Sequence, residues 1–195
     1  MSAAAASRLQ ATGTSSQTAG VGQTITVTAL DEFGNTDTAY TGAHTLVFSG
    51  AATSPGGSAP TVKLTAFGLG TSLTFTSGVT TGSMVLTKAE TATVGVGTYD
   101  GAITPADADR LTVVVSSARQ VRLQVTGSAT QTAGVGQTVT VTAYDAYGNV
   151  ATGYTGNKAL YFSGAGTPVG GSAPTATDKN GAAVVFGDPT TLAFV

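Results

Sequence analysis

The chain has 195 residues, of which 9% are charged and 7% aromatic, with no Cys, no Trp, one His and a formal net charge of −2. These counts exclude disulfides and cysteine catalysis, and eight scattered Lys and Arg residues do not make the basic surface that nucleic-acid binding requires. Thr (37), Ala (31) and Gly (27) are the commonest residues, which favours strands and turns. The sequence contains no run of about 18 apolar residues, the length that a membrane-spanning helix requires, so membrane insertion is not predicted.

Short runs with apolar residues at alternate positions predict antiparallel strands along the first 118 residues. The clearest run is 24–29, which places Ile25, Val27 and Ala29 on one face and three threonines on the other. The other runs are 8–11, 44–49, 62–67, 72–76, 82–87, 91–96 and 110–116. Seven to eight short strands separated by turn residues, without helical periodicity, are the signature of an immunoglobulin-like sandwich. Ten residues are expected to complete its core: Leu46, Phe48, Phe67, Leu73, Phe75, Met84, Leu86, Leu111, Val113 and Val115.

The sequence contains an internal repeat. Residues 17–42 recur as 131–156 at an offset of 114, with 19 of 26 positions identical. Copy two then carries five extra residues, expected in a loop, after which Phe67 and Phe75 match Phe186 and Phe194 at an offset of 119. This period is the size of one sandwich domain. The predicted fold class is therefore all-β, with tandem immunoglobulin-like antiparallel β-sandwich domains: a complete repeat in 7–118 and a second repeat in 119–195 that lacks its last strands.

Copy two stops at Val195, which matches Thr76, so the counterparts of residues 77–118 are missing. An incomplete sandwich exposes its core face and strand edges. Three explanations remain open: the sequence is a segment of a longer protein, a neighbouring molecule donates the missing strands, or the chain folds differently. The link between the copies, residues 116–120, has neither Gly nor Pro. It is expected to join the last strand of copy one almost directly to the first strand of copy two and to limit bending.

Residues 140–156 resemble the bacterial immunoglobulin-like (Big-type) tandem repeats of large surface adhesins and extracellular multidomain proteins. Copy one retains the same motif residues, namely Asp31, Gly34, Asn35, Tyr40, Thr41 and Gly42. The resemblance implies a sandwich used as a spacer or stalk in an extracellular or cell-surface protein of bacterial type. It also implies neighbouring repeats, or other copies of the same chain, as partners.

The Asp-x-x-Gly-Asn motifs are candidate metal sites, because calcium prefers oxygen ligands and would stiffen a stalk. The candidates are Asp31 and Asn35 in copy one and Asp145 and Asn149 in copy two, with Asp107 and Asp109 before the last strand of copy one. The same spacing also makes a turn in which Asp accepts backbone N–H groups and Gly takes positive φ. One carboxylate and one amide are few ligands, so the turn interpretation is favoured.

Catalytic chemistry is not indicated. His44 is the only histidine, and its counterpart in copy two is Lys158, so no general base recurs and no Ser-His-Asp set can be assembled. The glycine pairs lack a dinucleotide or phosphate-binding fingerprint. The chain is therefore predicted to be no enzyme and to carry no cofactor. Lys88 is expected to form an exposed ion pair with Glu90 rather than an isopeptide bond.

Tyrosines supply the remaining candidate site. Tyr144, Tyr147, Tyr154 and Tyr161 stand in copy two where copy one has Leu30, Phe33, Tyr40 and Val47. They could form a platform for a surface glycan, although aromatic residues beside turns more often close the end of a sandwich. Three functions follow as alternatives: a stiff structural spacer, a filament subunit that assembles by strand complementation between chains, and a carbohydrate-binding accessory module.

Overall fold

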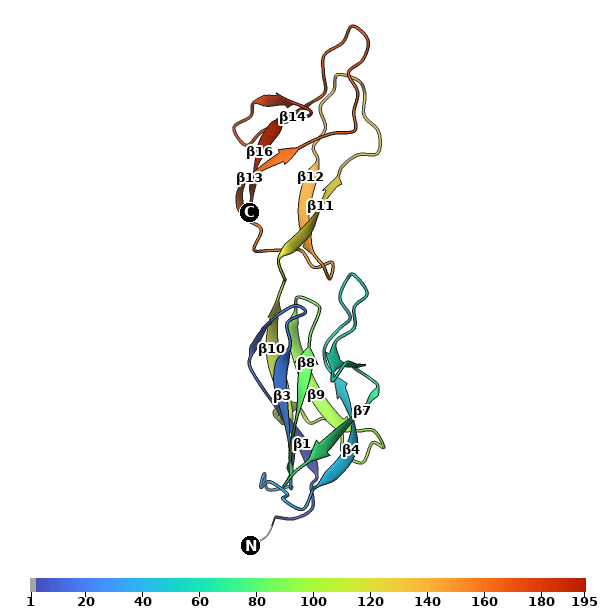
Figure 1. The fold of residues 1–195 in the computed structure, drawn as a ribbon, viewed down its shortest axis with the longest axis vertical. Coiled ribbons are helices and arrows are strands. Elements are labelled where there is room, and N and C mark those ends of the chain that lie inside the picture. The colour runs from blue at the N-terminus through green and yellow to red at the C-terminus, as the bar shows by residue number, and fades with distance from the viewer. Residues whose placement is uncertain (1–2) are drawn as a thin grey trace. The chain divides into compact units, whose positions relative to one another are not determined.

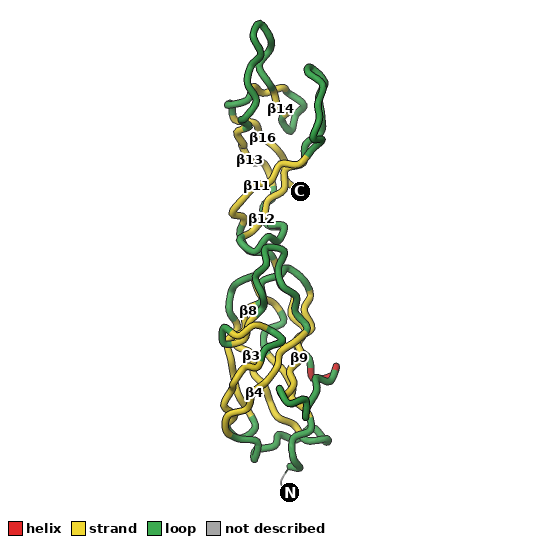
Figure 2. Tube along the Cα trace, turned by 90° about the vertical axis from the view of Figure 1, so that its right-hand side faces the viewer, coloured by secondary structure: helices red, strands yellow, loops and turns green. Residues whose placement is uncertain are grey.

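The computed structural model describes residues 3–195, and strands dominate it (Figure 1). The one helical segment in that range is a 3-10 turn at Asp107–Asp109, drawn in red in Figure 2, so no helix there could cross a bilayer. The predicted all-β class is confirmed. Contacts divide the chain into two compact units, residues 1–151 and 152–195. The predicted domain boundary at 118/119 stays a prediction.

The first unit contains a sandwich of two five-stranded sheets. One sheet has the order β1 (Arg8–Thr12), β3 (Gln23–Leu30), β8 (Val79–Val85), β5 (Thr61–Val62), β6 (Thr65–Ala66). The other has the order β2 (Ser16–Thr18), β10 (Leu111–Ser116), β9 (Thr91–Thr98), β4 (Gly42–Ser49), β7 (Gly70–Phe75). All pairings are antiparallel except that of β2 with β10, which is parallel. Each sheet lays one apolar face on the other, as expected for an immunoglobulin-like sandwich.

Alternation along the strands produces the core. In β3, Ile25 and Val27 are fully buried, while Thr24 is exposed and Thr26 half-buried. Nine of the ten residues predicted to complete the core are less than 10% exposed, which confirms the period-two pattern as the cause of burial. Phe67 is the exception: it is half-buried and packs its ring 6.0 Å from the ring of Phe48.

Two predicted strands differ from those observed. Residues 62–67 do not form one strand but the short hairpin β5–β6, because Lys63 and Leu64 take φ values of 47° and 65° and reverse the chain. Strand β2 was not predicted. Its three residues carry no apolar alternation, and it is a strand only because Ser16–Thr18 pair with β10, almost a hundred residues away.

The first unit continues into copy two through a short link. Strand β10 ends at Ser116 and β11 (Gln120–Thr126) begins four residues later, as the absence of Gly and Pro predicted. β11 pairs with β12 (Thr140–Asp145), and its register of Leu123 opposite Ala143 repeats that of Leu9 opposite Ala29. Leu9 is 2% exposed, whereas Leu123 is 40% exposed, so the same inward position is covered in one copy and open in the other.

The second unit repeats local geometry of copy one. Its strands are β13 (Gly156–Tyr161), β14 (Thr175–Thr177), β15 (Ala183–Val185) and β16 (Pro189–Phe194). β13 pairs with β16 as β4 pairs with β7, and the Tyr154 and Phe194 rings meet edge-on at 4.7 Å as Tyr40 and Phe75 do at 4.8 Å. The insertion lies in the turn of the β14–β15 hairpin, where Asp178 accepts N–H bonds from Asn180 and Ala182, so its prediction as a loop is confirmed.

The matched leucines give a test of this difference in burial. Leu9→Ala should lower the free energy of unfolding by about 2–5 kcal/mol, because it leaves a cavity in a closed core. Leu123→Ala should cost about 1 kcal/mol or less, because its side chain keeps much of its contact with water. Urea titration, with hydrogen exchange followed in β3 and β12, measures the change in the free energy of unfolding for both variants. An equal loss in the two variants would contradict the described packing.

Candidate functional site

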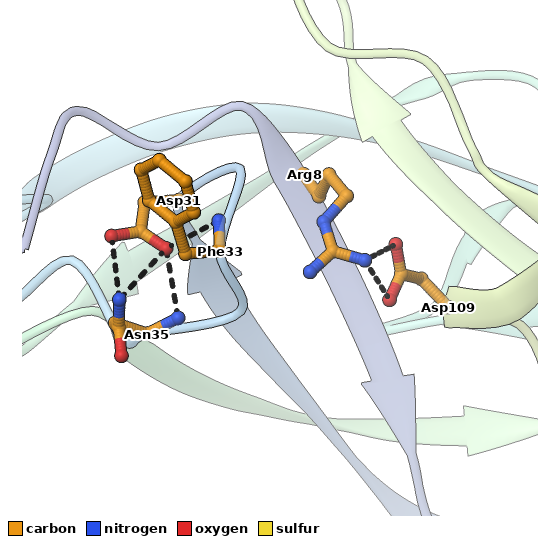
Figure 3. A network of polar contacts seen from close by, with 5 residues as sticks. All are labelled: Arg8, Asp31, Phe33, Asn35 and Asp109. Carbon is orange, nitrogen blue, oxygen red and sulfur yellow. Dashed lines mark hydrogen bonds and ion pairs between the residues drawn. The ribbon is translucent and has the colours of Figure 1, made fainter.

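The Asp-x-x-Gly-Asn segment of copy one is a closed turn after β3 (Figure 3). The Asp31 carboxylate accepts the backbone N–H groups of Phe33 (3.0 Å) and Asn35 (2.8 Å) and the side-chain amide of Asn35 (3.1 Å). Its Oδ2 also accepts the N–H of Ala4 (3.1 Å), which ties the incoming chain to the turn. Gly34 closes the turn at φ 87°, a conformation that glycine adopts without strain.

The corresponding segment of copy two has the same construction after β12. Asp145 accepts the N–H groups of Tyr147 (2.8 Å) and Asn149 (2.9 Å) and the side-chain amide of Asn149 (2.9 Å). Its Oδ2 accepts the N–H of Ala118 (2.9 Å), in the link between the copies. Gly148 has φ 80°. The turn therefore fixes the link to the first hairpin of copy two.

These hydrogen bonds favour the ionised form of both aspartates. Burial alone would raise the pKa of Asp31, but the donors from Asn35, Ala4 and Phe33 outweigh it and lower that pKa below its usual value. The pKa of Asp145 is lowered in the same way: burial opposes ionisation, and the donors from Asn149, Ala118 and Tyr147 favour it. Both turns are therefore built around an ionised carboxylate.

The arrangement leaves the calcium candidates with little capacity for a cation. N–H donors point at both oxygens of Asp31 and of Asp145, and each such donor presents positive charge where a metal would sit. No group of three or more His, Asp or Glu side chains gathers anywhere in residues 3–195. The turn interpretation describes what these residues do in the structure.

The other two candidate acids are paired with arginines. Asp109 is buried and lies 3.4 Å from Arg8 Nη1, beside the Asp31 turn (Figure 3). Asp107 has a fully exposed side chain and an ion pair of 3.1 Å with Arg110. Asp109 thus holds the 3-10 turn to strand β1, and the two acids do not share a site.

The turn of copy two also contacts the end of copy one, which the sequence did not predict. Asn149 is 4% exposed; its Oδ1 accepts the N–H of Ala89 (2.9 Å) and its amide donates to the carbonyl of Thr87 (2.9 Å). The N–H of Gly56 donates to the carbonyl of Tyr147 (2.7 Å). The Tyr147 ring covers Gly20, where an added Cβ would overlap it. We call this set of contacts the junction.

A sequence signal for the junction existed in the position of the motif. The turn is tied to a link too short to separate the two copies, so its residues had to lie near the end of copy one. The acceptor and donor at Thr87 and Ala89 carry no pattern, because any residue has these backbone groups.

The four candidate tyrosines have different surroundings. Tyr144 lies under the guanidinium of Arg122, 4.2 Å from its ring centre, and Tyr147 packs in the junction. In the second unit, Tyr154 packs on Phe194 with the Lys158 amine 5.1 Å from its ring centre, whereas Tyr161 is 70% exposed. The Tyr147 ring is thus occupied by packing, and Tyr161 presents the most open ring of the four.

A groove of about 540 Å³ lies on copy one and includes its only histidine. His44 stacks on Tyr40 at 4.0 Å between ring centres, and its Nε2 lies 3.1 Å from the carbonyl of Thr41. Burial, and after it the charge of Asp100, raise the pKa of Tyr40. Lys88 pairs with Glu90 at 3.0 Å, as predicted, but the pair is half-buried rather than exposed, because Glu90 also accepts the N–H of Ala52.

Comparison with known proteins found structural likeness at low sequence identity. No family model and no curated protein matches the chain. Among solved structures, the chain is similar to the surface layer protein SbsC, domains 4–9, with a TM-score of 0.35 and 14% identity over 97% of this chain. The chain spans 27% of that chain's length.

The lowered pKa values predict a loss of stability in acid. A carboxyl whose pKa is lower when folded stabilises the fold above its unfolded pKa of about 3.9, and this contribution is lost as the pH falls through the folded value. Asp145→Asn should lower the free energy of unfolding at pH 7 by about 1–3 kcal/mol and flatten its decline below pH 4. Denaturant titrations from pH 7 to pH 2 measure both effects, with Glu32→Gln as the charge control; an unchanged acid decline would contradict the assignment.

The saturated carboxylates predict indifference to calcium. Adding calcium at about 1 mM, the weak end of protein affinities, should leave Tm unchanged, since ligand binding to the folded state would raise it. A calcium-dependent rise in Tm that disappears in Asp145→Asn would contradict this interpretation.

Proposed function

We propose that this chain is a non-enzymatic structural module of a cell-surface or extracellular protein, in which bacterial-type immunoglobulin-like repeats act as a stiff spacer. The observation that carries the proposal is the junction. A spacer needs successive repeats that do not bend freely, and the junction holds the turn after β12 of copy two to copy one at points other than the covalent link.

Three features of the junction support stiffness. The link has three residues between β10 and β11, and its Ala118 N–H is held by Asp145. Asn149 is buried and makes two hydrogen bonds to backbone groups of copy one. These bonds are specific in direction, and the bond to Thr87 is buried, so they resist rotation about the link.

Strand complementation between chains is the second candidate, favoured by exposed apolar side chains on β11. Leu123 and Val125 are 40% and 54% exposed, whereas Leu9 and Ala11, in the same register, are 2% and 3% exposed. Hydrogen exchange of residues 119–195 at low and high protein concentration tests it. Protection that grows with concentration supports donation of strands by another chain, and concentration-independent exchange rejects it.

The proposed stiffness is tested by Asn149→Ala. Removing this side chain should free the β11–β12 pair from copy one, because Asn149 supplies two side-chain hydrogen bonds of the junction. The rotational correlation times from ¹⁵N relaxation, equal for the two parts in the parent, should then separate. Asn35→Ala is the matched control, because it removes the same turn bonds without touching the junction; separate correlation times already present in the parent would contradict the proposal.

A further inference from the structure

The two Asp-x-x-Gly-Asn turns share their internal hydrogen bonds but differ in what covers them. Asp31 and Asp145 each donate their N–H to the carbonyl of the Asn four residues on, both at 2.9 Å. In copy two, Asn149 is 4% exposed because copy one covers it. In copy one, Asn35 is exposed and Phe33 is 77% exposed. Copy one therefore presents, uncovered, the turn that is covered in copy two.

We propose that the Phe33–Gly34–Asn35 turn is a docking surface for another repeat of this kind. The occupant is a repeat of the copy-one type joined ahead of Ala4. It would bind through the end of its sandwich that Gly20, Gly56 and Thr87–Ala89 form. This inference rests on the proposed spacer function and extends it to a second, equivalent junction.

The polar groups of the exposed turn match that occupant. Asn35 has the amide that Asn149 uses for its two junction bonds, and no hydrogen bond to its Oδ1 occurs within residues 3–195. In the junction, Asn149 bonds to the carbonyl of Thr87 and the N–H of Ala89. The same pair on another repeat would satisfy Asn35 in the same way.

The shape of the turn also fits. Phe33 takes the place of Tyr147, whose ring covers the bare backbone of Gly20. Gly34 takes the place of Gly148, which approaches Gly56 so closely that a Cβ on either residue would meet the backbone of the opposite turn at 2.7–2.8 Å. A large exposed aromatic beside a glycine gives the same flat, Cβ-free contact, and the exposed area of Phe33 is apolar surface that docking would remove from water.

The entry of the chain is already in place. Ala4 donates to Asp31 Oδ2 at 3.1 Å as Ala118 donates to Asp145 Oδ2 at 2.9 Å. If another repeat is joined to Ala4 as residue 117 is joined to Ala118, the end of that repeat would therefore lie beside the turn.

The test joins residues 3–117 of copy one ahead of Ala4 of the whole chain. The amide of Ala89 in the added copy should exchange at least about tenfold more slowly than the Ala89 amide of the Asn149→Ala chain, whose junction is open. Phe33→Ala should abolish this protection in the extended protein, while Phe33→Tyr, which installs the residue of copy two, should keep it. In the parent chain, Phe33→Ala should leave Tm unchanged.

Failure of this inference is separable from failure of the spacer proposal. If the added Ala89 exchanges as fast as in the open junction while the Asn149 junction remains rigid by ¹⁵N relaxation, the docking surface is rejected and the spacer stands. If both junctions are loose, the spacer proposal fails too. Docking in tandem would also be overturned if the Ala89 amide became protected only when copy one is supplied as a separate chain, and not in the joined protein.

Discussion

The ionised carboxylate of each Asp-x-x-Gly-Asn turn is the interaction on which the arrangement of the repeats depends. Asp145 accepts four N–H donors, three from its own turn and one from Ala118 in the link. It therefore fixes the shape of the turn and the direction in which the chain enters copy two. Asn149, held by Asp145, can then reach the backbone of copy one. Hydrogen bonds to a charged acceptor are stronger than neutral ones, so Asp145 holds Ala118 firmly to the turn.

The turn can bind the link and the neighbouring copy because the fold positions it at the end of its strand. β3 lies inside a five-stranded sheet with Ile25, Val27 and Ala29 buried in the core, and β12 pairs with β11, where Ala143 is buried. Gly20, Gly56 and Thr87–Ala89 come from three separate connections of copy one, and only the packing of both sheets brings them to one surface. The geometry of the junction therefore depends on the stability of the sandwich, because loss of either sheet would separate the groups that Asn149 contacts.

Copy one and copy two differ mainly in what surrounds similar residues. The aromatic pair Tyr40–Phe75 recurs as Tyr154–Phe194, and His44 on the first tyrosine is replaced by Lys158 on the second. Such substitutions keep a flat or cationic group over the ring, so they preserve its packing. The glycan platform of Tyr144, Tyr147, Tyr154 and Tyr161 stays a prediction.

The sequence by itself determined the all-β class, the repeat, most strands, nine of the ten predicted core residues and the Asp-x-x-Gly-Asn turns, because these follow from alternation and from short-range hydrogen bonding. Only the tertiary structure decided that β2 is a strand, that residues 62–67 turn back at Lys63 and Leu64, and that Asn149 is buried against Thr87 and Ala89. The physical reason is that these features use backbone groups from distant parts of the chain. Every residue carries such groups, so no sequence pattern marks the ones that will meet.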